Sequence, residues 1–146
     1  MTEVSFHFNA PDKVSYACRL LRKASASGAK VVVTAESELL RALDAGLWTF
    51  SPLDFVAHCY APAANADVLQ ASPVVLMEAA RETPHQQVLV NLGQQVPEGF
   101  ERFERLIEVV TQDADDRQQA RQRWKHYADR GYAITRHDLA GREERA

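Results

Sequence analysis

The stretch Val4–Ala35, VSFHFNAPDKVSYACRLLRKASASGAKVVVTA, contains the pattern from which the fold class follows. Residues 4–9 alternate large apolar and polar side chains, as a strand does, and Asn9-Ala-Pro-Asp12 supplies turn residues and a helix cap. From Asp12 to Ala26 apolar residues recur every three or four positions, which predicts a helix. Residues 30–35 form a β-branched run typical of a strand covered on both faces. Strand, helix and strand in this order predict a parallel pair joined by a right-handed crossover.

The rest of the chain continues this alternation. Further segments with regular periodicity are a helix at 36–47, strands at 73–77 and 87–91, and helices at 100–111 and 113–130. The helix at 100–111 is predicted because its apolar residues, from Phe100 to Val110, share one face at helical spacing. These patterns predict a single α/β domain over residues 1–138, with a mixed, largely parallel sheet flanked by helices. Residues 139–146 are expected to be a disordered charged tail.

The composition is that of a soluble globular domain, with 46% hydrophobic and 25% charged residues. A net charge of −3 argues against bulk binding to nucleic acid but leaves a local basic patch open. Two cysteines, Cys18 and Cys59, are too few for a secreted disulfide scaffold. The start of the chain does not resemble a signal peptide, and no run approaches the ~18 apolar residues of a membrane span. We therefore expect a cytoplasmic protein.

The signals of cofactor and metal chemistry are missing from the sequence. The glycines, at 28, 46, 93, 99, 131 and 141, include no pair in G-x-G spacing, so no phosphate loop is expected. The five histidines lack the short paired spacings of zinc sites. Cys59 beside His58 could form a nucleophile pair, but a buried apolar cysteine is the favoured interpretation. We expect no cofactor, no metal and no catalytic residues.

The helix at 113–130 carries the clearest candidate site. Arg117, Arg121, Trp124 and Lys125 are separated by three or four positions and form one strip on that helix. Cations that flank an indole can bind a carboxylate while the ring binds an apolar group, which suits a short acidic peptide with a hydrophobic end. The same strip could bind the phosphates and a stacked base of a single-stranded nucleic acid or nucleotide. A third interpretation, in which Trp124 packs inward and the bases only solvate an outer face, stays open.

A second candidate is the aromatic segment Trp48–His58, WTFSPLDFVAH. Pro52 interrupts it, and it is too irregular for a helix and too apolar for an ordinary loop. Its aromatic residues either close the end of the core or form an exposed patch for a partner protein.

At these motifs the chain resembles the chi subunit family of bacterial DNA polymerase III, from Val4 to about Asp138. The motifs are Leu47-Trp48 followed by Phe55-Val-Ala-His58, the strand Val88-Leu-Val-Asn91, and Ala120-Arg-Gln-Arg-Trp-Lys-His-Tyr127 closed by Gly131-Tyr132. The last motif is the most specific.

The resemblance implies a non-catalytic adaptor of the replicative holoenzyme with a nucleotide-binding-like fold that lacks the phosphate loop. Chi proteins link the psi subunit of the clamp loader to the acidic C-terminal tail of single-stranded DNA-binding protein, so DNA is met only indirectly. The positions that match the tail site are Arg121, Trp124, Lys125 and Val110, the last on the predicted helix at 100–111; those that match the psi site are Trp48 and Phe55. A monomer, or a heterodimer with psi, is expected.

Overall fold

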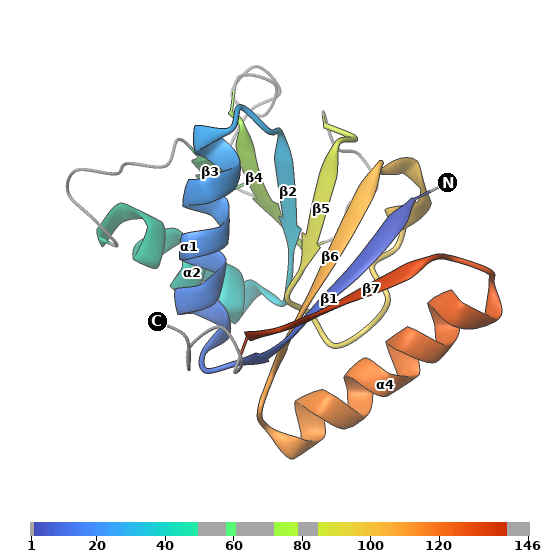
Figure 1. Cartoon of the computed structure of the whole chain (residues 1–146). Helices are drawn as coiled ribbons and strands as arrows, with labels where there is room; N and C mark the ends of the chain where they lie inside the picture. The colour runs from blue at the N-terminus through green and yellow to red at the C-terminus, as the bar shows by residue number, and fades with distance from the viewer. Residues whose placement is uncertain (1, 50–57, 61–71, 79–84, 140–146) are drawn as a thin grey trace.

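A computed structural model describes residues 2–49, 58–60, 72–78 and 85–139 (Figure 1). The elements, in chain order, are β1 (Glu3–Ala10), α1 (Lys13–Ala26), β2 (Val31–Thr34), α2 (Ser37–Thr49), β3 (His58–Tyr60), β4 (Val74–Met77), β5 (Val88–Asn91), η3 (Phe100–Arg102), β6 (Arg105–Thr111), α4 (Ala114–Asp129) and β7 (Ile134–Asp138). The predicted α/β class is confirmed. None of the described helices is long and apolar enough to cross a membrane.

The strands form one seven-stranded sheet in the order β3-β4-β2-β5-β6-β1-β7. Every strand pair within the described residues is parallel. β1 and β2 are therefore parallel, as predicted from Val4–Ala35, but they are not hydrogen-bonded neighbours because β5 and β6 lie between them. Local periodicity predicts that a strand forms, and does not specify which strand it pairs with.

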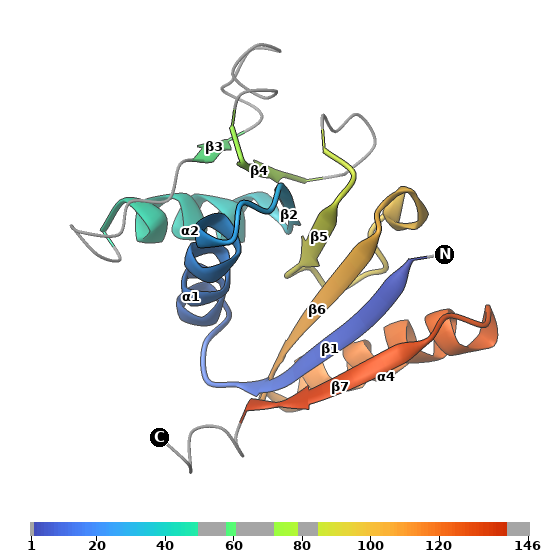
Figure 2. The same ribbon diagram turned by 45° about the horizontal axis from the view of Figure 1, so that its top comes forward.

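Helices cover the two faces of the sheet in different places. α1 and α2 pack on one face, where Leu21 and Leu43 join a cluster with Val33 of β2. α4 packs on the other face, where Tyr127 joins Phe6 of β1 and neighbouring apolar residues. Figure 2 shows α4 running along the edge formed by β1 and β7.

The start and end of α1 follow the sequence prediction. The Asp12 side chain caps the helix by accepting a hydrogen bond from the Ser15 backbone N–H (2.8 Å). Gly28, which follows the helix, has a φ of +82°, a conformation that glycine adopts without steric cost.

The predicted helix at 100–111 is wrong. Only Phe100–Arg102 is helical, as one 3-10 turn, and residues Arg105–Thr111 form β6, an interior strand of the sheet. Leu106 and Val110 join the cluster beneath α4, while Ile107 and Val109 join the opposite cluster. A strand buried on both faces has apolar residues at nearly every position, and such a run also contains the spacings of an amphipathic helix.

Strand β7 was not predicted. It is an edge strand that pairs with β1 alone among the described strands, and most of its residues are exposed. Leu139, the first residue of the predicted tail, is buried. Residues 140–146 lie outside the described part of the chain, so the disorder of this tail stays a prediction.

Candidate functional site

Helix α4 is anchored at its start by Asp116. The side chain of Asp113 caps the helix by accepting a hydrogen bond from the Asp116 backbone N–H (3.1 Å). The buried Asp116 carboxylate accepts hydrogen bonds from the Thr111 backbone N–H and hydroxyl (2.8 and 2.9 Å) and from Lys13 Nζ (2.9 Å). Burial alone would raise the pKa of Asp116, but these hydrogen bonds and the Lys13 charge outweigh it and lower the pKa. α4 is thereby tied to both β6 and α1.

The face of α4 that packs on the sheet carries a buried polar network around Glu108 of β6. Arg123 and Glu108 are 2% and 0% exposed, and Arg123 Nε lies 3.1 Å from Glu108 Oε1. The Tyr127 hydroxyl donates to Oε2, and Asn91 Nδ2 donates to Oε1 (2.9 Å). Burial raises the pKa of the Glu108 carboxyl despite the nearby guanidinium. Because Arg123 points into the core, the rotation of α4 about its own axis is fixed. Arg121 and Trp124 therefore face the side of the helix where β1 and β7 lie.

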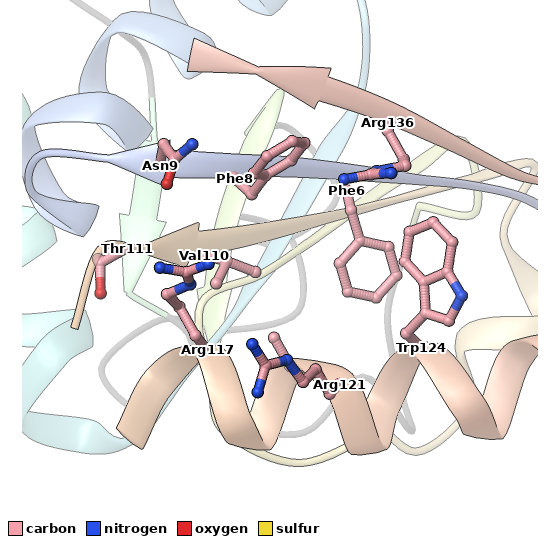
Figure 3. A pocket seen from close by; sticks show the side chains of 10 residues that line it. Phe6, Phe8, Asn9, Val110, Thr111, Arg117, Arg121, Trp124 and Arg136 are labelled. Atoms are coloured by element: carbon pink, nitrogen blue, oxygen red, sulfur yellow. The ribbon is translucent and has the colours of Figure 1, made fainter. Parts of the chain in front are cut away.

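On that side, residues of α4, β1, β6 and β7 line an open groove of about 470 Å³ (Figure 3). Its apolar floor contains Phe6 and Val110, which are both buried. The half-buried ring of Trp124 lies 5.0 Å from the Phe6 ring, centroid to centroid. The interpretation in which Trp124 packs inward is therefore right in part, because the ring packs on the core and also lines the groove.

Arginines lie on both walls of this groove. Arg117 and Arg121 project from α4, and Arg136 comes from β7 on the opposite side (Figure 3). Arg136 Cζ lies 5.1 Å from the centroid of the Phe8 ring and 5.9 Å from that of Trp124, within the range of cation–π attraction. None of the residues that line the groove is acidic. The groove can therefore hold an anionic group beside an apolar one.

The structure brings together three of the four residues predicted for the tail site. Arg121, Trp124 and Val110 all line the groove, although Val110 lies on strand β6 and not on a helix. Lys125 is exposed on α4 and does not line it.

Sequence reasoning missed Arg136, Phe6 and Phe8 as groove residues. The alternation in residues 4–9 does place Phe6 and Phe8 on one face of a strand, but nothing in that pattern indicates which helix covers the face. The sequence does not predict Arg136 as a groove residue, because it does not predict β7, the strand that carries Arg136.

The second candidate surface is described in part. Trp48 lies at the end of α2 and is 59% exposed, so it does not close the core. Its ring lies 5.3 Å from the ring of His58. Phe55 lies outside the described residues, and its proposed role stays a prediction.

The sequence also offers Cys59 and His58 as a possible nucleophile pair. In the structure, the His58 ring contacts the Asp44 carboxylate. Its Nε2 lies 2.9 Å from Asp44 Oδ1. The side chain of Cys59 lies outside the described part of the structure, so the structure does not test this pair. Within the described residues, no group of three or more His, Cys, Asp or Glu side chains is placed to hold a metal ion.

These features define a class of protein: a single α/β domain with a parallel sheet and a cationic groove beside its edge strand. The chain belongs to the family described as DNA polymerase III chi subunit, HolC, which matches residues 1–135. It is 31% identical to the DNA polymerase III subunit chi of Pseudomonas aeruginosa over 144 residues, which cover 95% of this chain and 98% of the relative. It is 29% identical to that of Haemophilus influenzae over 121 residues, 82% of each chain. The resemblance seen in the motifs is confirmed, and by family the chain is an accessory subunit that serves DNA replication.

Proposed function

We propose that this chain is an adaptor that links the psi subunit of the clamp loader to the acidic C-terminal tail of single-stranded DNA-binding protein. The tail binds the groove between α4 and β7, and psi binds the surface around Trp48. The observation that carries the proposal is the presence of arginines on both walls of an apolar groove. An acidic peptide that ends in a hydrophobic residue is complementary to both features.

Each groove residue has a distinct role in this proposal. Arg121 and Arg136, on opposite walls, hold the terminal carboxylate of the tail, since a guanidinium can donate two parallel hydrogen bonds to it. Trp124 and Val110 receive the terminal apolar side chain. Lys125, exposed on α4, attracts the acidic residues upstream of the terminus.

The proposed contact with psi is argued from the exposure of the Trp48 side chain at the surface. Trp48 is the large hydrophobic side chain most exposed among the described residues, and tryptophan is a common anchor of protein interfaces. It lies on α2, across the sheet from α4 (Figure 1). Phe55 is proposed to extend this surface.

The tail site is tested by titration with an acidic peptide that ends in a hydrophobic residue, once with a free carboxylate and once amidated. Arg121→Ala and Arg136→Ala should each weaken binding of the free peptide by about ten- to a hundredfold, because each removes a cation that pairs with a carboxylate. Both substitutions should matter less for the amidated peptide, which has already lost the terminal charge.

Arg41→Ala is the matched control, because it removes the same charge from an exposed site on α2. If Arg121→Ala, Arg136→Ala and amidation all leave the peptide affinity unchanged, the groove is not the binding site of the tail. The alternative function, single-stranded nucleic-acid binding by the same groove, requires an oligonucleotide to compete with the peptide and to lose affinity in the Arg121→Ala variant.

A further inference from the structure

A second pocket lies back to back with the groove, across the edge of the sheet. Alternation along β1 and β7 separates the two, since Phe6, Phe8 and Arg136 line the groove, whereas His7 and His137 line the second pocket. His7 and His137 are partners in the β1–β7 register. Two ligands can therefore bind at one edge of the molecule, one on each face.

The second pocket is basic. Arg19 and Lys23 of α1 and Arg105 of β6 line it, and all three are exposed. None of its lining residues is acidic, although the whole chain has a net charge of −3. A local excess of cations in an acidic protein concentrates anions at that place.

Ring systems form the inner part of this pocket. The His7 ring lies 4.6 Å from that of His137 and 5.8 Å from that of Tyr16, between centroids. A hydrogen bond between His7 Nδ1 and the Tyr16 hydroxyl holds two of the three rings together. The hollow, about 710 Å³, is large enough for a nucleotide unit.

We propose that this second pocket binds single-stranded DNA, with the cations on phosphates and a base against the Tyr16 and His137 rings. Cations that follow a backbone, together with rings that receive bases, are the two components of single-strand binding sites. An acidic peptide would use the cations and leave the rings without a matching group. The site is separate from the tail groove and does not depend on the function proposed for that groove.

The test measures the affinity of a fluorescent oligothymidine for the full chain across a series of salt concentrations. The double variant Arg19→Ala/Lys23→Ala should weaken binding at least about tenfold at low salt. The slope of log affinity against log salt should become shallower by roughly 1.4, since each phosphate contact contributes about 0.7 for single strands. An abasic strand of equal length should bind the unmodified chain about fivefold or more weakly.

The control variant Lys30→Ala/Arg41→Ala removes the same charge from exposed positions that line neither pocket. It should bind the oligonucleotide like the unmodified chain, and so should Arg121→Ala. Four results would overturn the proposal: no saturable binding, equal loss in both double variants, loss in Arg121→Ala instead, or equal affinity for the abasic strand. Loss of acidic-peptide binding in Arg19→Ala/Lys23→Ala would assign the pocket to a protein ligand and would also overturn it.

Discussion

Arg121 and Arg123 are two positions apart on α4, and the fold uses them in opposite ways. Arg121 is exposed at the wall of the groove, whereas Arg123 is 2% exposed and bound to Glu108. One Arg123 nitrogen, Nη2, is buried without a hydrogen-bond partner among the described residues. The buried ion pair between Arg123 and Glu108 therefore orients α4, but it leaves one buried N–H group of Arg123 without a hydrogen bond to the described residues, which costs free energy.

Arg123→Leu should destabilise the domain by about 3–5 kcal/mol, because it leaves the Glu108 carboxylate buried without its cation. Urea unfolding at neutral pH measures the loss. The double variant Glu108→Leu/Arg123→Leu should be more stable than Arg123→Leu, since it removes the unpaired charge as well. Equal losses in the single and double variants would show that the buried charge is not the cause.

At the scale of elements, the groove is built from four elements: β1, near the start of the chain, and β6, α4 and β7, which follow one another about a hundred residues later. β1 lies between β6 and β7 in the sheet, and α4 connects β6 to β7 across the face of β1. The floor therefore comes from β1 and β6, and the two walls come from α4 and β7. The position of α4 depends on its anchored first turn, which Asp116 ties to β6.

Asp116→Asn should lower the stability at pH 7 by about 1–3 kcal/mol, because the amide replaces a buried acceptor of charged hydrogen bonds. The pKa of Asp116 is lowered in the folded state, so its contribution is complete above the unfolded value of about 3.9. That contribution is lost as the pH falls through the lower folded value. The difference in stability between the unmodified chain and the variant should therefore shrink as the pH falls below about 4.

Urea midpoints measured from pH 7 to pH 3 check this expectation. Asp115→Asn is the matched control, since Asp115 lies in the same helical turn but is exposed. A difference between Asp116→Asn and the unmodified chain that stays constant down to pH 3 would contradict the assigned role.

On the scale of the whole molecule, the two proposed partner surfaces lie on different layers. Trp48 belongs to α2, which packs on one face of the sheet, and the groove belongs to α4 on the other. An adaptor needs such separation, because both partners must bind at the same time.

Trp48→Ala should therefore release psi and leave single-stranded DNA-binding protein bound, whereas Arg121→Ala should do the reverse. Co-purification of the tagged variants from bacterial cells gives the answer. Both side chains lie at the surface, so thermal unfolding should show changes within about 0.5 kcal/mol. Loss of both partners from either variant, with the fold intact, would reduce the model to a single interface.

Several elements could be predicted because their signals are local. The helix at 113–130 follows from its capping residues and charges, and the β-branched run at 30–35 predicts β2. The segment 100–111 could not be assigned correctly, since a strand buried on both faces has no distinctive period. Arg136 could not be predicted as a groove residue, because its edge strand is mostly exposed and has few apolar residues.

Local sequence was therefore sufficient for the α/β class, most of the helices and strands, and the spacing that brings Arg121 beside Trp124. Those features depend on residues within a few positions of one another, which helical and strand geometry relates directly. Only the tertiary structure orders the strands, turns Arg123 inward to Glu108, and brings Val110 and Arg136 to one groove. These outcomes depend on partners far away in the chain, because a buried charge or a strand edge is stabilised by whatever the fold places beside it.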